Sequence, residues 1–347
     1  MKALRATSSG SVEVVDVPEP VAGVGEALMR TRVAGICGSD LLDWYVRGKA
    51  GTVLGHEVSG SIAAVGGGAP GFSVGDRVAP HHHAPCLGCD ACRAGRYVHC
   101  AEWRRSRLDP GGFAELVRIP AGNLARDTAR VPDGVSDEAA TFVEPLATVV
   151  KALSRARLER GQSLLCIGLG PAGQLVVRLA RARGGSRVAG SDPAAFRRAA
   201  AEAAGADGAI DPSRERLVPA ARALTGGRGF DVVLVGPGKR EVVREAFDAV
   251  ADGGTLLLFT MAPRGEEWDA PLHDLYFREV SVVPSYSCGP DDTAESLDAI
   301  ASGKVRVDDL VSHRFPIERA AEAFARARNP EGAMKVVIEF GGGGGSG

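Results

Sequence analysis

The chain has 347 residues, a formal net charge of −2, and 45% hydrophobic residues. This length predicts about two domains, and the near-balanced charge gives no reason to expect a nucleic acid or a membrane surface as a partner. No apolar run approaches the ~18–20 residues that span a bilayer, and the N-terminal stretch "MKALRATSSGSVEVVDVPEP" lacks an apolar signal segment. We therefore expect a protein of the reducing cytoplasm.

Residues 1–150 are rich in short β-type runs separated by glycine and proline. Five such runs are "SVEVVDVP", "EALMRTRVAGIC", "EVSGSIAAVG", "GDRVAP" and "FAELVRIP". They predict a mainly-β domain.

The pattern changes near Glu144, where "AATFVEPLATVVKALSRARL" has the apolar spacing of a helix. Strand-like and helix-like segments then alternate through residues 151–286, including "SLLCIGLG", "AGQLVVRLARARG", "SRVAGSD", "FDVVLVGPG", "EVVREAFDAVADGG" and "TLLLFT". This alternation predicts an α/β domain with a doubly wound parallel sheet. Residues 287–340 form a mixed tail, and 341–347 read as a linker that we leave out of the fold.

Four of the seven cysteines are crowded into residues 86–100, at Cys86, Cys89, Cys92 and Cys100. In a reducing compartment such a group is typical of metal ligands, and four thiolates surround one tetrahedral Zn²⁺. An iron–sulfur cluster is the main alternative, but the ferredoxin run has its fourth cysteine after three residues, followed by proline. Here the last gap is seven residues and Ala101 follows. We interpret the lobe as a closed, structural zinc site, with incidental free thiols as the remaining alternative.

The string "GLGPAG" follows one predicted strand and opens a helix. In that context Gly168 allows a tight turn, Gly170 lets the backbone approach a pyrophosphate, and Gly173 lets helix and strand pack closely. Pro171 and Ala172 begin the helix, whose free N–H groups favour phosphate. The motif predicts dinucleotide binding.

Asp192 lies 19 residues beyond Gly173, at the end of the next predicted strand. A carboxylate there accepts hydrogen bonds from a ribose 2′-OH and repels a 2′-phosphate, which favours NAD over NADP. Arg197 and Arg198 are close enough in sequence to reach a phosphate, although solvated helix charges are the simpler interpretation.

A second set of metal-binding residue types is spread over "GICGSD", "GHE" and "FVEP", as Cys37, His56, Glu57 and Glu144. One thiolate, one imidazole and a carboxylate suit a catalytic zinc that keeps an open position. Spacing alone leaves this open, because an isolated cysteine and histidine are more often core residues.

These motifs occur in the order found in zinc-dependent medium-chain alcohol dehydrogenases, which the chain resembles from "MKALRA" to "MKVVIEF". The resemblance implies a GroES-like catalytic domain, a Rossmann domain, and a return of residues 287–340 to the catalytic domain. It also implies two zinc ions per chain, a nicotinamide cofactor, a small alcohol or ketone substrate, and a homodimer or homotetramer.

The resemblance implies roles for individual residues. Cys37 and His56 match the catalytic zinc ligands, Glu57 the adjacent carboxylate, and Glu144 the third ligand position. Ser39 matches the hydroxyl that contacts the substrate oxygen, and Thr148 lies where the family has a residue near the nicotinamide. Many relatives have a proton-relay histidine where this chain has Leu42.

The substrate pocket is expected to be polar, with five candidate residues: Asp43, Trp44, His82, Tyr286 and Ser287. Glu144 favours the sorbitol-type branch, while the absence of arginine from "PSYSCG" weakens a direct sorbitol assignment. We expect an NAD-dependent dehydrogenase of a polyol, sugar or cyclitol. A simple or aromatic alcohol, or a threonine-like amino alcohol, is the second hypothesis. A non-catalytic regulatory protein that binds zinc and a nucleotide is the third.

Overall fold

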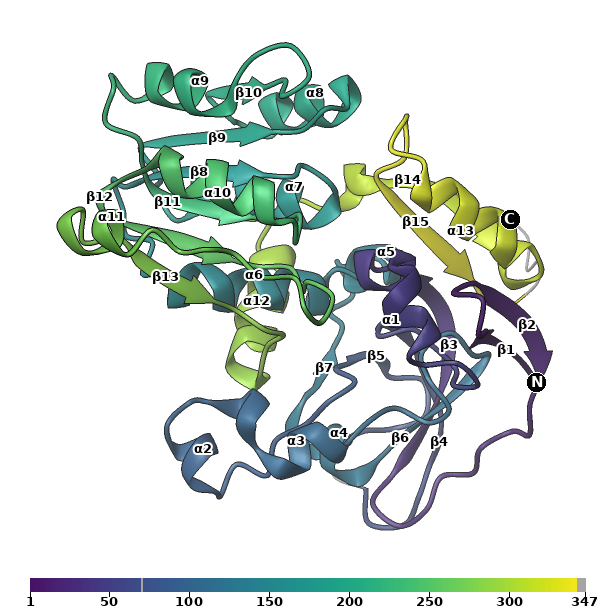
Figure 1. Ribbon diagram of the computed structural model, residues 1–347. Coiled ribbons are helices and arrows are strands. Elements are labelled where there is room, and N and C mark those ends of the chain that lie inside the picture. Colours follow the sequence, from purple (N-terminus) through teal and green to yellow (C-terminus); the bar gives the residue numbers. More distant parts are fainter. Residues whose placement is uncertain (70, 342–347) are drawn as a thin grey trace. The chain divides into compact units, whose positions relative to one another are not determined.

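The computed structural model describes residues 1–69 and 71–341 (Figure 1). Two compact units emerge. The first contains Met1–Ala147, Cys288–Asn329 and the described part of Ala333–Gly347. The second contains Thr148–Ser287 and Pro330–Gly332. Apart from Gly341, the predicted linker 341–347 lies outside the described residues.

The second unit is built on a parallel sheet with the order β10-β9-β8-β11-β12-β13 in the described residues. Its strands are β8 (Ser163–Ile167), β9 (Arg187–Ser191), β10 (Gly208–Ile210), β11 (Phe230–Val235), β12 (Val250–Leu258) and β13 (Ser281–Pro284). Numbered from β8, the order is 3-2-1-4-5-6, which is that of dinucleotide-binding doubly wound folds. The predicted Rossmann sheet is confirmed.

Helix α6 (Val143–Arg155) precedes β8. The helices that connect these strands are α7 (Pro171–Ala182), α8 (Ala195–Ala203), α9 (Leu217–Leu224), α10 (Arg240–Ala249) and α11 (Leu272–Phe277). Strand β8 is buried at every position, as expected for a central parallel strand whose two faces are both covered. The loop that follows β8 therefore starts from a strand that is packed on both faces.

The predicted helix over "EVVREAFDAVADGG" is too long at its C-terminal end. Helix α10 ends at Ala249, and Val250 already belongs to β12. The ladder shifts register there, because Val250 pairs with Phe230 while Thr255 pairs with Val232. The residues "DGG" form this irregularity, and Gly253 has a φ of +74° that glycine adopts at little cost.

The first unit is mainly β, as predicted. Its larger sheet has the order β14-β15-β3-β4-β5-β7, with β6 also paired to β3, and β1 and β2 form a separate hairpin in the described residues. The strands are β1 (Lys2–Ala6), β2 (Val12–Asp16), β3 (Ala27–Gly35), β4 (Glu57–Val65), β5 (Arg77–Pro80), β6 (Leu116–Ile119), β7 (Thr128–Arg130), β14 (Val311–Pro316) and β15 (Lys335–Glu339). Because β15 pairs antiparallel with β3, the end of the chain joins the sheet that leads to Cys37.

Short helices fill the connections of the first unit. They are α1 (Asp43–Arg47), α2 (Asp90–Arg93), α3 (Ala101–Arg105), α4 (Ala121–Arg126), α5 (Asp137–Ala140), α12 (Pro290–Ala301) and α13 (Ala320–Arg328), with 3₁₀ turns η1 (Gly38–Leu41), η2 (Tyr97–His99), η3 (Asp308–Leu310) and η4 (Ile317–Arg319). The core includes Met29, Phe113, Ile119 and Phe324, all at most 2% exposed. No helix in the described ranges is long and apolar enough to cross a membrane.

Candidate metal centres and active site

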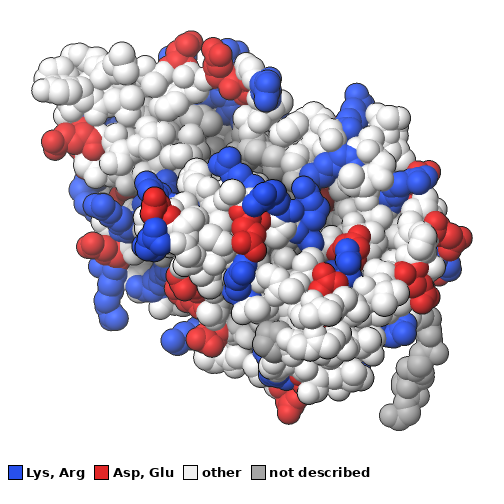
Figure 2. Space-filling view, turned by 90° about the horizontal axis from the view of Figure 1, so that it is seen from below, with Lys and Arg blue, Asp and Glu red and all other residues white. Residues whose placement is uncertain are grey.

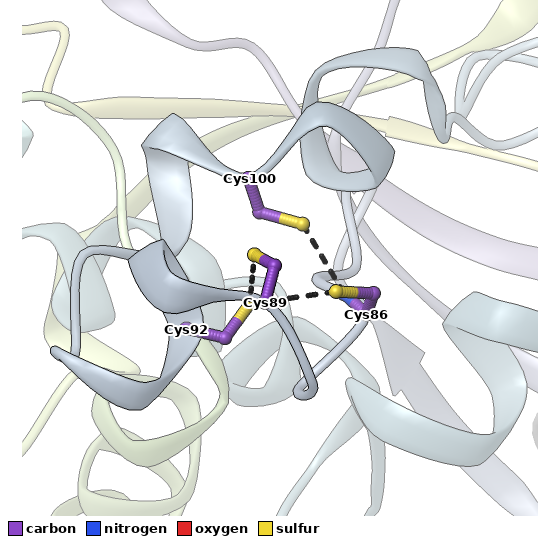
Figure 3. Close-up of side chains that lie close together, drawn as sticks. All are labelled: Cys86, Cys89, Cys92 and Cys100. Carbon is purple, nitrogen blue, oxygen red and sulfur yellow. Dashed lines mark hydrogen bonds between the residues drawn. The ribbon is translucent and has the colours of Figure 1, made fainter.

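The four lobe cysteines face one another across a small space (Figure 3). Their sulfur atoms all lie within 4.8 Å of one another. The Sγ atoms of Cys86 and Cys92 are 3.9 Å apart, and those of Cys89 and Cys92 are 3.5 Å apart. Two thiolates on one tetrahedral zinc, each about 2.3 Å from the ion, are separated by about 3.8 Å. The spacing therefore fits a shared zinc, and a disulfide bond of about 2.05 Å is excluded.

The backbone of the lobe also favours the thiolate form of Cys100. Helix α2 begins after Cys89 and helix α3 begins after Cys100. Burial acts to raise the pKa of the Cys100 thiol, but backbone N–H groups of Cys86, Trp103 and Glu102 outweigh it and lower that pKa to about 6. Trp103 is 2% exposed and packs against the cluster. Local structure thus prepares the lobe for a metal.

A second group joins Cys37, His56 and Glu57, whose ligand atoms lie within 4.8 Å of one another. Strand pairing explains the meeting, since Gly35 of β3 is the register partner of Glu57 of β4. Cys37 follows β3 after one residue, and His56 directly precedes β4. Burial opposes a charge on His56, but the Cys37 sulfur, Asp40 and Glu144 raise its pKa well above the usual value. The Cys37 sulfur and the His56 imidazole therefore interact directly.

Two supporting residues were missed in the sequence. The Asp40 carboxylate is 1% exposed and accepts the Cys37 backbone N–H at 3.2 Å. Lys335 forms an ion pair with Glu57, and both side chains are 2% exposed. Lys335 Nζ also donates to the Ile36 carbonyl at 3.2 Å. The signal for Lys335 is its position inside the apolar run "AMKVVIEF". A lysine in such a run is expected to be buried, and a buried lysine requires a charged or polar partner.

Glu144 lies near this group, at the start of α6. Its carboxylate forms a group with His81 and His82, whose ligand atoms all lie within 4.8 Å of one another, whereas the group of Cys37, His56 and Glu57 does not include it. His56, His81 and Glu144 also line one cavity of about 10 Å³. Burial raises the pKa of the Glu144 carboxyl, an effect that His56 partly offsets. Glu144, the predicted third zinc ligand, therefore lines the same small cavity as His56, another predicted zinc ligand.

The predicted substrate-contacting residues of the first unit differ in how far they are buried. Ser39 is half-buried in η1, two residues after Cys37. Asp43 and Trp44 lie on α1 and are exposed, and Asp43 pairs with Arg328 at 3.2 Å. The ring of His82 is 5.0 Å from that of His56, centroid to centroid. Burial and the neighbouring His81 lower the pKa of His82 well below its usual value, so its imidazole is neutral at pH 7.

In the second unit the glycine loop has the geometry that its sequence predicts. Gly168 has a φ of +95°, and a Cβ on Gly173 would lie 2.0 Å from the Gly168 carbonyl oxygen. The nearest atom to a Cβ built on Gly170 is 3.7 Å away, on Arg197. Helix α7 starts at Pro171, and Gly170 at its N-cap offers no capping side chain. The open space and exposed N–H groups fit a pyrophosphate.

Asp192 sits beside this loop at the end of β9 and is 4% exposed. Its carboxylate accepts the backbone N–H groups of Leu169 and Ala194, each at 2.9 Å. Arg197 Nη1 is 3.7 Å from Asp192, whereas Arg198 is held by Asp211 at 2.8 Å and by the Asp192 carbonyl. Neither arginine is a solvated helix charge.

Three further residues of the predicted site lie in the second unit. Thr148 lies on α6. The Tyr286 side chain is 63% exposed, and its carbonyl accepts Lys151 Nζ at 2.7 Å. Ser287 has a φ of +50°, and its buried Oγ has no hydrogen-bond partner among the described residues.

Comparisons with known proteins agree with this geometry. A family model described as the alcohol dehydrogenase GroES-like domain matches residues 23–133, and one described as zinc-binding dehydrogenase matches residues 171–302. An L-threonine 3-dehydrogenase of Pyrococcus horikoshii is 31% identical over 338 residues, which cover 94% of this chain and 95% of that protein. This chain belongs to the zinc-dependent medium-chain alcohol dehydrogenases. The predicted family, GroES-like and Rossmann folds, and enzyme class are confirmed.

Matches to two further proteins also extend over nearly the whole chain. A sorbitol dehydrogenase of Bacillus subtilis is 29% identical over 359 residues, covering 97% of each chain. A solved structure of a zinc-binding dehydrogenase from Sinorhizobium meliloti, bound to NADP, has a TM-score of 0.86 and 29% identity, and the match covers 97% of this chain and 98% of that one.

Proposed function

We propose that this dehydrogenase transfers a hydride between NAD and a secondary alcohol group of a polyol, sugar or cyclitol, with Cys37 and His56 at the reacting centre. The proposal rests on the closeness of the Cys37 and His56 ligand atoms, together with the Glu144 carboxylate in the same cavity as His56. Residues 1–150 and 287–340 supply the catalytic part, and residues 151–286 supply the cofactor part.

The donor set fits a catalytic zinc, with a thiolate from Cys37, an imidazole from His56 and a carboxylate from Glu144. When bound, zinc supplies Lewis-acid chemistry that lowers the pKa of an alcohol. Glu57 is available as a fourth group, although its ion pair with Lys335 holds it in place. The lobe cysteines hold a second, structural zinc, which the sulfur spacing supports.

The chain's own groups position the substrate and move its proton. Ser39, two residues from Cys37, accepts a hydrogen bond from the substrate hydroxyl and passes its proton outward. The aliphatic side chain of Leu42 cannot relay a proton. The substrate proton therefore leaves through water, the cofactor ribose or Glu57. The neutral His82 lies beside His56 and offers a polar atom to the substrate.

The cofactor is NAD. Gly168, Gly170 and Gly173 shape the phosphate-binding turn, and Asp192 accepts the ribose hydroxyls. Its buried carboxylate beside the glycine loop supports this assignment. Arg197 is the guanidinium next to Gly170 and the group that would favour a 2′-phosphate.

The oligomer is a dimer or tetramer. Strand β13 ends the sheet order of the described residues, so one of its edges is unpaired there. Leu272, Tyr276 and Phe277 on the nearby segment α11 are 77%, 78% and 70% exposed. An unpaired edge with exposed apolar side chains favours a second copy of the chain as its cover. Light scattering on the purified protein measures the mass directly.

A threonine-like amino alcohol is the second candidate substrate, favoured by the identity to threonine dehydrogenases. A non-catalytic protein that binds a nucleic acid would need a mainly basic surface. On the face in Figure 2 acidic and basic side chains are both widespread, so this face does not suit a nucleic acid. The decisive experiment is NAD reduction with polyols, sugars, cyclitols, simple alcohols and L-threonine. The proposal expects the highest kcat/KM for a polyhydroxylated substrate. Preference for L-threonine would select the second candidate, and no turnover with any alcohol would reject the dehydrogenase assignment.

A further inference from the structure

The side-chain amide of Gln174 connects two segments of the second unit. Gln174 lies in the first turn of α7, directly after Gly173, and is 0% exposed. Its Nε2 donates to the Leu169 carbonyl at 2.9 Å and to the Arg197 carbonyl at 3.0 Å. One buried amide therefore joins the glycine loop to the first turn of α8, 23 residues further along the chain.

The two carbonyl partners determine which way the Gln174 amide points. An amide nitrogen carries two hydrogens and can donate to two carbonyl oxygens, whereas an amide oxygen only accepts. A reversed amide would set Oε1 against both carbonyl oxygens, so Nε2 faces them. Oε1 itself is buried and has no hydrogen-bond partner among the described residues. The chain thus keeps an incompletely paired polar group in a place where an apolar side chain would be less costly.

The glycine loop is held by side chains on both sides of Leu169. The Leu169 N–H donates to Asp192 Oδ2 at 2.9 Å, and its carbonyl accepts the Gln174 amide at 2.9 Å. Leu169 lies between Gly168, whose φ is +95°, and Gly170 at the N-cap of α7. The Gln174 amide therefore helps to fix the turn that is to receive the pyrophosphate.

The same amide holds the backbone of Arg197, whose side chain returns to this turn. Arg197 Nη1 is 3.7 Å from a Cβ built on Gly170 and 3.7 Å from Asp192 Oδ2. The contact with Asp192 is too long for a hydrogen bond, and Arg197 Nε is buried without a hydrogen-bond partner in the part of the chain that the structure describes. The guanidinium thus has donors available for an anionic group at Gly170.

We propose that Gln174 is a positioning residue of the cofactor site, whose amide holds the glycine turn and Arg197 together for the cofactor phosphates. Because Gln174 is 0% exposed, it acts through these partners. Without the amide the turn and the start of α8 are free to move apart, and cofactor binding must order them again. The loss therefore falls on cofactor affinity. This inference rests on the dinucleotide cofactor of the proposed function.

The test variant is Gln174→Met, which keeps the length of the side chain and removes the amide. NADH affinity is measured by the fluorescence of its reduced nicotinamide, a readout that requires no alcohol substrate. We expect the dissociation constant for NADH and the KM for NAD to rise about threefold to tenfold. The kcat at saturating NAD and the zinc content should stay unchanged. Gln174→Asn, whose amide is one carbon too short to reach both carbonyls, should weaken binding similarly and serves if the methionine variant does not fold.

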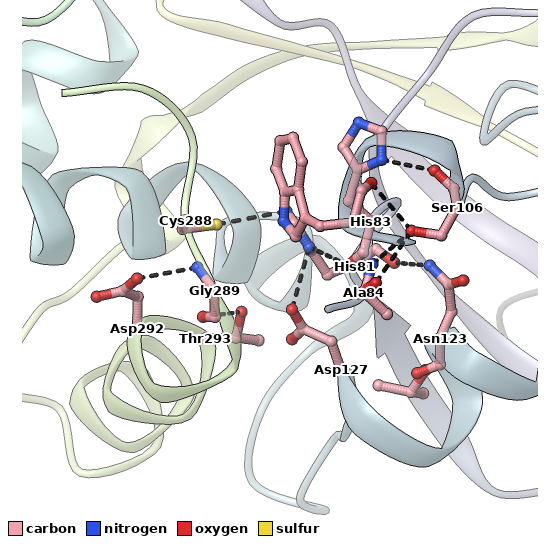
Figure 4. Close-up of polar contacts among 12 residues, drawn as sticks. His81, His83, Ala84, Ser106, Asn123, Asp127, Cys288, Gly289, Asp292 and Thr293 are labelled. Carbon is pink, nitrogen blue, oxygen red and sulfur yellow. Dashed lines mark hydrogen bonds and ion pairs between the residues drawn. The ribbon is translucent and has the colours of Figure 1, made fainter. Parts of the chain in front are cut away.

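Two controls separate positioning from a general loss of stability. Asn123 is a matched buried amide of the first unit: it is 0% exposed, its Nδ2 donates to the His81 carbonyl at 3.0 Å (Figure 4), and its Oδ1 also lacks a partner among the described residues. Ser163 begins β8, at the end of the strand away from the glycine loop, and its Oγ donates to Asp231 at 2.6 Å. Asn123→Leu and Ser163→Ala should lower the thermal midpoint and keep the parental NADH dissociation constant.

A double-mutant cycle with Arg197→Ala tests the route of the effect. Gln174→Met should weaken NADH binding less in the Arg197→Ala background than in the parent. Fully additive losses would contradict the link to Arg197. Parental NADH affinity in both Gln174 variants, or an equal loss in the two controls, would overturn the inference and leave the cofactor assignment intact. A parent protein that does not bind NADH would overturn the proposed cofactor and this inference together.

Discussion

The Lys335 ammonium lies against the Glu57 carboxylate, and both side chains are 2% exposed. A buried charge that loses its partner costs roughly 3–5 kcal/mol, whereas replacing both charges is often nearly neutral. Lys335→Met should therefore lower the free energy of unfolding by about that amount. Lys335→Met combined with Glu57→Gln should recover most of the loss in chemical denaturation. Additive losses would mean that the two groups act independently.

The lobe should bind its zinc independently of catalysis. Cys89→Ser removes one of four thiolates from a closed site. We expect the loss of one zinc equivalent, a lower thermal midpoint, and no change in NADH affinity measured by the fluorescence of its reduced nicotinamide. If Cys89→Ser keeps the parental zinc content, the four cysteines do not form a zinc site.

Asp192 should select NAD. The parent should have a higher kcat/KM with NAD than with NADP, and Asp192→Ala should reduce the NAD value at least about tenfold while changing the NADP value less. Asp192→Asn is the matched control, because it keeps the size and one acceptor oxygen. A parent that already prefers NADP would refute the assignment and point to Arg197.

Glu144 should act at the metal. A carboxylate that only stabilises the start of α6 contributes roughly 0.3–1 kcal/mol, so Glu144→Gln would then leave activity nearly unchanged. A metal ligand should cost about 10–100-fold in metal affinity or activity. Zinc content and kcat of Glu144→Gln distinguish these cases, and near-parental values of both would exclude Glu144 from the metal site.

Local motifs made much of this molecule predictable. The string "GLGPAG" between a buried strand and a helix identified the turn at Gly168, because its function depends on residues adjacent in sequence. The same holds for the four lobe cysteines within residues 86–100. The strand pattern of "EALMRTRVAGIC" likewise predicted β3, which leads to Cys37.

Partners distant in sequence were not predictable in this way. Lys335 meets Glu57 across 278 residues and Cys288 meets His81 across 207. Only the return of the chain to the first unit brings each pair together. Asp40 was missed for a different reason, since its role is to hold the Cys37 backbone and no spacing rule marks that contact. The end of α10 was misplaced because the bulge at "DGG" depends on pairing with β11.

The most direct test of the account is Cys37→Ser, assayed for zinc, NAD binding and NAD reduction on the best alcohol found for the parent. We predict the loss of one zinc equivalent with the lobe zinc retained, parental NAD affinity, and a fall in kcat of at least about 100-fold, because Lewis-acid activation of the alcohol is lost. Near-parental kcat with full zinc content would contradict the central claim that Cys37 and His56 hold the catalytic metal.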